Sequence, residues 1–210
     1  MYQPVVTNRF TKGPMGVSRF PFVRYRLAQE GQKDHAVVFP VSIQDKKDAK
    51  ECTPEQRATA KADATLYAAS PALLEANELV DIAWAGGETN MSEAANACRL
   101  AIALAGEGYT EGPLEIRQFS PVDFAIAQVG KMPHGMIYPS GVYRAQDVAK
   151  ATPEQVVTAK ADATLYAASP ALLEAAKLFV SSWMGGGSED ERMSSAVDAC
   201  LLAIALAGME

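Results

Sequence analysis

Histidine, cysteine and tryptophan are scarce in this sequence, whose 210 residues include two histidines, three cysteines and two tryptophans. The cysteines, Cys52, Cys98 and Cys200, are odd in number and lack CxxC spacing, which excludes a disulfide framework and favours a reducing compartment. The histidines, His35 and His134, have no cysteine or paired carboxylate nearby, so they are poor material for a zinc site. We therefore expect neither a metal nor a cofactor.

Long apolar runs, a signal sequence and a surplus of basic residues are also missing. No apolar run is long enough to span a bilayer, and the N-terminal MYQPVVTNRF lacks the charged-then-apolar order of a secretory signal. The net charge of −6 argues against binding nucleic acid through its phosphates, which needs a concentrated basic face. We expect an acidic, cytoplasmic protein that binds neither a membrane nor, directly, a nucleic acid.

What the sequence does contain is one stretch in two copies. Residues 59–76 read TAKADATLYAASPALLEA, and residues 158–175 repeat them letter for letter, ninety-nine positions later. The same offset extends on both sides, until the second copy gains three residues in a Gly-rich acidic loop. This internal duplication predicts two tandem similar units, each large enough to bury a core. The predicted division is a lead-in at 1–12, unit one at 13–106, a linker at 107–111 and unit two at 112–210.

Each unit begins with segments rich in β-branched and aromatic residues, separated by turn residues, which is typical of strands. We predict three short antiparallel strands per unit, with a hairpin in unit one. The segments that carry this prediction are 17–27 and 36–43 in unit one, and 114–119, 124–129 and 136–143 in unit two.

Helices follow the strands. Thr53 with Gln56 three residues later, and a proline between them at the first helical position, form a capping-box signature that recurs at 152–155. Pro71 disfavours a helical conformation at Ser70, so we predict a kink or sharp turn there and a second helix beyond it.

The second helix is predicted to end at the glycine pair 86–87. A last helix, capped by Asn90, is alanine-rich and is predicted to stop at Gly106; its counterpart in unit two is predicted to end at Gly208. Each unit is therefore expected to be α+β, a small antiparallel sheet followed by two or three helices.

Arginines in the first strand segment are the main candidates for a binding site. Arg24 and Arg26 alternate with apolar residues and so point to one face of a strand, and Arg19 lies nearby. Guanidinium groups on a sheet face suit phosphate or carboxylate ligands, with Arg144 as a further candidate in unit two. A solvated face paired with the acidic helices is the plainer explanation.

Aromatic residues of the repeated helices are the other candidates. Tyr67 and Tyr166 could take a polar role because a buried tyrosine hydroxyl needs a partner, although core filling is favoured. Trp84 and Trp183 lie beside glycines at equivalent helix ends. They could form a ligand platform, but closure of the core is the favoured interpretation.

Catalytic motifs do not stand out. The Gly-rich loops follow helices instead of leading from a strand into a helix, which argues against a phosphate-binding P-loop. His35 and His134 would need a nucleophile or carboxylate brought to them by the fold. Cys98 and Cys200 lie in apolar helices and are expected to be small core residues. We expect a protein that is not an enzyme.

Taken together, the order of these signals resembles a widespread group of small, mostly uncharacterised bacteriophage and prophage proteins. Those begin with a Gly-Pro-aromatic strand and carry a helix reading roughly asparagine-alanine-arginine-leucine-isoleucine, three alanines, proline, then leucine-leucine-glutamate. The match lies at 62–76 and 161–175, with Gly-Pro pairs upstream at 13–14 and 112–113. The resemblance implies a phage gene product in the host cytoplasm, and such genes often act against host defences.

The leading expectation is an interaction protein of phage origin that inhibits a host protein, such as a defence protein, by occupying its surface. Its acidic body could meet a basic nucleic-acid-binding groove. The alternative is a module that sequesters a small anionic ligand such as a signalling nucleotide. The contacts would then be Arg19, Arg24, Arg26, Arg144, Tyr67 and Tyr166. A homodimer formed through the alanine-rich helices is left open.

Overall fold

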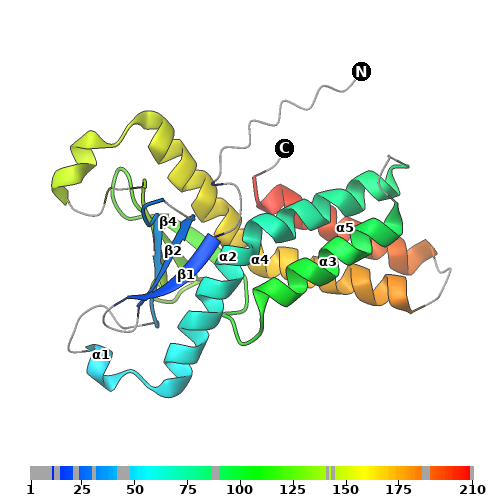
Figure 1. Cartoon of the computed structure of the whole chain (residues 1–210), viewed down its shortest axis with the longest axis horizontal. Helices are drawn as coiled ribbons and strands as arrows, with labels where there is room; N and C mark the ends of the chain where they lie inside the picture. The colour runs from blue at the N-terminus through cyan, green and yellow to red at the C-terminus, as the bar shows by residue number, and fades with distance from the viewer. Residues whose placement is uncertain are drawn as a thin grey trace.

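The computed structural model contains one antiparallel sheet and a helical bundle, at opposite ends of the molecule (Figure 1). Six strands and four long helices, with one short helix and one 3-10 helix, confirm the predicted α+β class. The structure describes residues 11, 15–20, 24–29, 32–41, 48–86, 90–140, 142, 145–185 and 190–208.

Strands and helices occur in the same order in the two halves of the chain. The first half contains β1 (Met15–Phe20), β2 (Arg24–Gln29), β3 (Ala36–Val38), α1 (Asp48–Glu51), α2 (Pro54–Trp84) and α3 (Met91–Ala105). The second half contains β4 (Leu114–Gln118), β5 (Phe124–Gln128), β6 (Gly135–Ile137), the 3-10 helix η1 (Ala145–Lys150), α4 (Pro153–Met184) and α5 (Asp190–Leu206).

All six strands belong to one sheet, in the order β1-β2-β3-β6-β5-β4. The central strands β3 and β6 pair with each other, with Val37 opposite Met136, so the strands of the second half continue those of the first. The sheet expected for each unit is thus half of a larger sheet. The segment 17–27, predicted as one strand, contains parts of β1 and β2, which pair with each other as neighbours.

A β-bulge precedes each central strand. Leu27 pairs with the first residue of β3, and its carbonyl also accepts a hydrogen bond from the backbone N–H of His35 at 3.1 Å. Two successive residues thus meet one partner, which is the pattern of a bulge and can re-aim a side chain. Ile126 meets His134 and the first residue of β6 in the same way. Both histidines have buried side chains.

The long helices begin at the predicted caps. The Thr53 hydroxyl accepts a hydrogen bond from the backbone N–H of Gln56, and the Gln56 side chain accepts one from the Thr53 N–H. α4 begins at Thr152 with the same capping box. α3 follows Asn90, whose side chain accepts a first-turn N–H, and it ends at Gly106 with φ of 71°. These cap predictions are confirmed.

Of the kink or sharp turn and the second helix predicted at Pro71, the second helix is wrong, because α2 and α4 run through Pro71 and Pro170 as continuous helices. Each of these helices bends about midway along its length (Figure 1). Proline lacks the N–H that would bond the carbonyl four residues earlier. In α4 that carbonyl belongs to Tyr166, and the Ser169 hydroxyl donates to it at 2.7 Å. A hydroxyl bond and close packing against the second long helix therefore outweigh the local proline signal.

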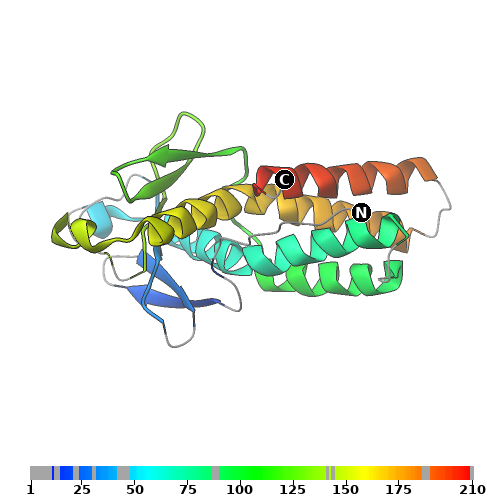
Figure 2. The ribbon, with the colours of Figure 1, turned by 90° about the horizontal axis from the view of Figure 1, so that it is seen from above.

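The two long helices cross and organise the molecule (Figures 1 and 2). Their N-terminal halves lie against the sheet, and their C-terminal halves pack with α3 and α5 as a four-helix bundle. Asn77 of α2 ties them together, since its Nδ2 donates to the carbonyls of Leu73 at 2.7 Å and Leu172 of α4 at 3.1 Å. Within the described residues, no helix is long and apolar enough to cross a membrane.

Candidate functional site

Four side chains from the two halves of the chain meet in the interior. The rings of Tyr67 in α2 and Tyr166 in α4 stack with centroids 5.5 Å apart and planes at 11°. His134 Nε2 lies 2.7 Å from the Tyr67 hydroxyl oxygen, and His35 Nε2 lies 2.7 Å from that of Tyr166. Each histidine thus reaches the tyrosine of the other half. We call these four residues the Tyr–His cluster.

The two tyrosine–histidine pairs differ in what else the tyrosine hydroxyl contacts. The Tyr166 hydroxyl donates to Met15 Sδ at 3.1 Å, so its oxygen accepts a hydrogen bond from the N–H at His35 Nε2. The residue ninety-nine positions after Met15 is a leucine, which offers no sulfur. The Tyr67 hydroxyl bonds His134 Nε2 and lacks such a sulfur contact, and the other ring nitrogen of His134, Nδ1, is buried with no hydrogen-bond partner among the described residues.

A buried carboxylate lies beside each tyrosine. Thr110 donates to Asp63 from its backbone N–H at 2.5 Å and from its hydroxyl at 2.8 Å. Thr11 donates to Asp162 in the same way, at 2.6 and 2.7 Å. Thr11 precedes β1 and is bonded to α4, whereas Thr110 precedes β4 and is bonded to α2. The segment before each half of the sheet is therefore attached to the long helix of the other half of the chain.

Burial determines the charges of this interior. Desolvation raises the pKa of Asp63 and of Asp162 to about 6, against the threonine hydrogen bonds, which lower it. Desolvation lowers the pKa of His35 and of His134 to about 4, so both imidazoles are neutral at pH 7. The 4.0 Å contact between His134 Nε2 and Asp63 Oδ2 is therefore not an ion pair at neutral pH.

This arrangement is suited to holding the halves together. Tyr67 and Tyr166, predicted as binding residues, are fully buried, and a phenol occupies the Nε2 of each histidine. A ligand would reach either phenol only if the sheet or helices moved apart. Contact of these tyrosines with a ligand or partner stays a prediction.

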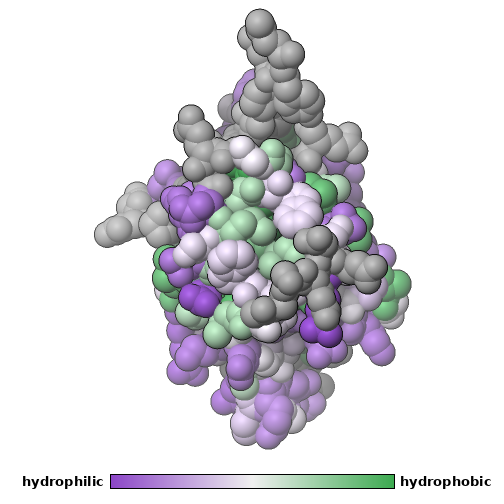
Figure 3. Space-filling model, turned by 90° about the vertical axis from the view of Figure 1, so that its right-hand side faces the viewer, coloured by the Kyte–Doolittle hydropathy of each residue, from purple (hydrophilic) through white to green (hydrophobic). Residues whose placement is uncertain are grey.

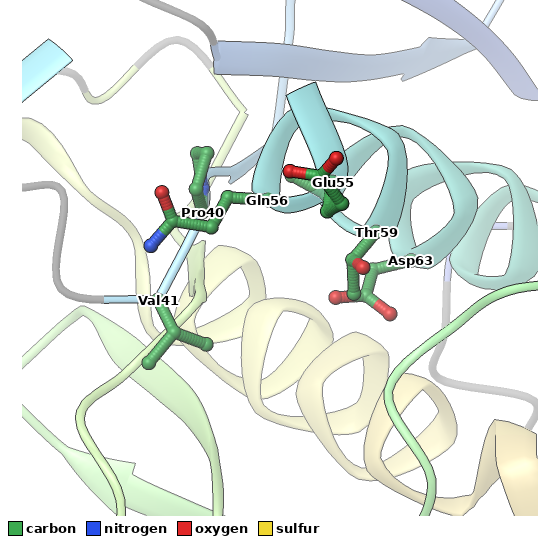
Figure 4. A pocket seen from close by; sticks show the side chains of 7 residues that line it. Pro40, Val41, Glu55, Gln56, Thr59 and Asp63 are labelled. Atoms are coloured by element: carbon green, nitrogen blue, oxygen red, sulfur yellow. The ribbon is translucent and has the colours of Figure 1, made fainter. Parts of the chain in front are cut away.

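A cleft of about 280 Å³ opens beside Asp63, where the first turns of α2 face the residues after β3 (Figure 4). Thr59 and Asp63 project side by side from one face of α2, as their spacing of four requires. The lining residues are Pro40, Val41, Glu55, Gln56, Thr59, Ala60 and Asp63. In the described part of the chain, no three His, Cys, Asp or Glu side chains are placed to hold a metal ion.

The predicted arginines that the structure describes lie on two faces of the sheet. Arg24 and Arg26 alternate with Tyr25, which packs on the core, so they point to the outer face of β2. Arg26 Nε lies 2.8 Å from Asp34 Oδ2, so it is paired with an aspartate between β2 and β3 and not with one of the acidic helices. Arg19 pairs with Tyr25 in register and so points to the opposite face of the sheet. Arg144 lies outside the described residues.

Aromatic residues are exposed at the free end of the bundle, where α2 and α4 end. Trp84 is 44% exposed, Trp183 is 40% exposed and Met184 is 65% exposed. Met91 and Met193, in the first turns of α3 and α5, are partly buried against the core at the same end. Figure 3 looks onto this end and shows apolar surface at its centre with polar residues around it. We call these five residues the bundle-end surface.

The favoured sequence interpretation of the tryptophans needs correction. Closure of the core predicts buried indoles, whereas about two fifths of each tryptophan faces solvent. Each lies in the last turn of its helix. The platform alternative agrees better with this geometry. Cys98 and Cys200 are fully buried, as predicted, and burial raises the pKa of each thiol to about 12.

Sequence reasoning missed the bonds of the Tyr–His cluster, although part of the signal was present. His35 and His134 are ninety-nine positions apart, as are Tyr67 and Tyr166, so any pairing had to occur twice. The sequence does not say that each histidine reaches the other half, because that depends on β3 pairing with β6. No protein-family model, curated protein or solved structure matches the chain.

Proposed function

We propose that this protein is a non-enzymatic interaction protein that binds a partner protein through the bundle-end surface. The observation that carries the proposal is the joint exposure of Trp84, Trp183 and Met184 where the two long helices end. Exposed apolar patches with a polar rim mark interaction sites in soluble proteins. Tryptophan is also enriched among the residues that dominate binding energy at interfaces.

The interior supports a scaffold role for the rest of the molecule. Hydrogen bonds from Thr11 and Thr110, and the two tyrosine–histidine bonds, connect segments far apart in the sequence. A scaffold fixed in this way holds the ends of α2 and α4 side by side in advance of binding. Preorganisation of this kind reduces the entropy that a binding surface loses when its partner arrives.

We further propose that the protein is encoded by a phage and acts in the host cytoplasm, where it covers part of a host defence protein. The support is the resemblance of residues 62–76 and 161–175 to helices of phage and prophage proteins. A tandem duplication is the origin that we propose for the two halves. It is supported by the identical stretch and by equivalent residues in equivalent bonds, such as His35 with Tyr166 and His134 with Tyr67.

Affinity capture from a nuclease-treated host lysate tests the protein-binding proposal. The variants are Trp84→Ala/Trp183→Ala and a matched control, Leu104→Ala/Leu206→Ala. The control leucines are 51% and 54% exposed in the last turns of α3 and α5, away from the bundle-end surface. We expect a stoichiometric partner with the wild type and the control and its loss with the tryptophan variant. Equal capture by all three proteins would contradict the proposal.

Sequestration of a small anionic ligand is the competing function, and the same preparations test it. Such a ligand would depend on Arg24 and Arg26, which share the outer face of β2. A ligand that raises the melting temperature of the wild type but not of Arg24→Ala/Arg26→Ala would favour this alternative. Because the tryptophans lie at the other end of the molecule, Trp84→Ala/Trp183→Ala would leave that response unchanged.

A further inference from the structure

The charges around the bundle-end surface narrow the kind of partner that fits it. We infer that this surface binds a positively charged amphipathic segment of a protein, with arginine or lysine side chains placed against Trp84 and Trp183. The inference rests on the proposed function, since it specifies the chemistry of the partner for the same surface.

The sequence that leads into and out of the end of α2 is acidic throughout. Residues 78–98 include four aspartates and glutamates and not one lysine or arginine. Asp81 lies one turn before Trp84 in α2, and Glu93 lies in the first turn of α3 at the same end. The loop sequence of the second half, 185–192, adds three acidic residues against one arginine. A cationic partner is therefore attracted to this end.

The dipoles of the helices at this end oppose one another, because α2 and α4 end where α3 and α5 begin. The last four carbonyls of a helix have no partner within the helix, and they carry about half a negative charge in the dipole description. Neither α2 nor α4 has a basic residue in its last turn to offset it. The unpaired N–H groups at the starts of α3 and α5 carry the opposite partial charge at the same end, so the attraction for a cation comes from the acidic side chains.

The tryptophans suit a cation better than they suit a purely apolar partner. An ammonium or guanidinium group over an indole face is attracted by the ring quadrupole, and tryptophan is the best residue for this contact. The aliphatic stems of lysine and arginine can at the same time cover the apolar surface of Met184. One basic amphipathic segment therefore satisfies both the charge and the apolar area.

Other occupants fit less well. A second copy of this chain would bring a second acidic end against the first, so like charges would face each other. Anionic lipid headgroups and nucleic-acid phosphates would be repelled for the same reason. Binding of a second copy or of anionic vesicles can be measured separately from binding of a basic peptide.

Tryptophan fluorescence gives a direct measurement, because the two tryptophans of the chain both belong to the bundle-end surface. The probe is a synthetic amphipathic helix of leucine and arginine without aromatic residues, and the matched control peptide has glutamate in place of arginine. We expect a saturable change in emission with the arginine peptide and none with the glutamate peptide. The affinity should fall several-fold when the ionic strength rises from about 0.15 to about 0.5 M.

Charge variants locate the binding. Asp81→Asn/Glu93→Gln removes two carboxylates beside the tryptophans, whereas Glu107→Gln/Glu111→Gln removes two exposed ones from the loop at the other end of α3. The first variant should bind the arginine peptide several-fold more weakly, and the second should bind as the wild type does. Equal binding of both peptides, or equal affinities of the two variants, would overturn the inference. Association of the protein with itself or with anionic vesicles through the tryptophans would also overturn it.

Calorimetry on Trp84→Ala/Trp183→Ala completes the test, since this variant has no emission to follow. A more than tenfold loss of affinity for the arginine peptide is expected if the indoles are central contacts. Failure of this inference can be told apart from failure of the proposed function. Suppose that a captured host protein depends on the tryptophans but stays bound at high salt. The proposed function would then stand, and the inference that the partner is cationic would be wrong.

Discussion

Tyr67 and His134 are sixty-seven positions apart in the sequence, yet the tyrosine hydroxyl lies 2.7 Å from the imidazole Nε2 in the interior. Tyr166 and His35 repeat the contact with the halves exchanged. The stacked tyrosines complete a row of four rings between the sheet and the crossing helices. The two halves are therefore interlocked through polar bonds as well as through apolar packing, and these bonds lead to specific predictions for stability.

Removal of the Tyr67 hydroxyl is expected to destabilise the protein. Tyr67→Phe leaves His134 Nε2 buried without a partner, which costs about 1–3 kcal/mol of the free energy of unfolding. The control is Tyr25→Phe, whose hydroxyl lies 3.4 Å from the Arg57 carbonyl in an exposed position and should change stability by less than about 0.5 kcal/mol. Urea unfolding at pH 7 measures both. Equal losses in the two variants would show that the bond to His134 is not stabilising.

Loss of the Thr110 hydroxyl is expected to act through Asp63. Thr110→Val removes the hydroxyl bond to Asp63 Oδ2 but keeps the backbone bond, so the pKa of this carboxyl should rise above about 6. The loss of stability should be about 1–2 kcal/mol at pH 8, where the carboxylate is charged, and smaller at pH 5. Thr65→Val is the control, because the Thr65 hydroxyl bonds its own helix in an exposed position. A loss that is the same at both pH values would contradict this role.

The pH dependence of stability is expected to contain two opposing contributions. His35 and His134 have a pKa of about 4 in the folded protein against 6.5 when exposed, so their contribution is present above pH 6.5 and is lost as the pH falls toward 4. Asp63 and Asp162 have a pKa of about 6 in the folded protein against 3.8, so their ionisation destabilises the fold as the pH rises from about 4 to 6. Each group contributes on the order of 3 kcal/mol, and the two effects nearly cancel.

Asparagine at both aspartate positions separates these contributions. Asp63→Asn/Asp162→Asn removes the contribution of the aspartates and leaves that of the histidines. The free energy of unfolding of the variant should therefore fall by several kcal/mol between pH 6.5 and 4. The wild type should change little over the same range. Urea unfolding at steps of pH measures this difference. A variant with the same flat profile as the wild type would contradict the assignment of neutral, buried histidines.

The continuity of α4 through Pro170 is expected to depend on Ser169. Ser169→Ala leaves the Tyr166 carbonyl, which the proline cannot bond, without its hydroxyl donor at 2.7 Å. The expected loss is about 1–2 kcal/mol, because the carbonyl is in a buried part of the helix. Ser181→Ala is a matched control, since the Ser181 hydroxyl also bonds a carbonyl three residues earlier but is exposed. Thermal unfolding that ranks the two variants equally would show that the Ser169 bond does not support the helix.

Local signals in the sequence predicted the local parts of the fold. Thr53 with Gln56, and Asn90, marked helix starts correctly because a cap depends on residues within one turn. The second helix predicted beyond Pro71 is absent because α2 is held in one piece by contacts with α4, which are not local. Propensity is a weak guide where tertiary packing decides.

The relationship between the halves could not be read from the repeat alone. Two copies of a segment are compatible with two separate sheets or with a single sheet. The pairing of Val37 in β3 with Met136 in β6 joins the strands of both halves into a single sheet. The candidate arginines were placed on a strand correctly, but Arg19 and Arg26 point to opposite faces because a hairpin separates them. The exposure of Trp84 and Trp183 depends on where α3 and α5 begin relative to the ends of α2 and α4.

Native mass spectrometry of protein purified gently from host cells tests the central claim, that the bundle-end surface binds a protein. The account predicts a complex of defined stoichiometry with a host protein for the wild type. It predicts the free chain mass for Trp84→Ala/Trp183→Ala, while Leu104→Ala/Leu206→Ala behaves as the wild type does. A small excess mass that is released on mild denaturation, and is retained by the tryptophan variant, would contradict the account and favour a sequestered ligand.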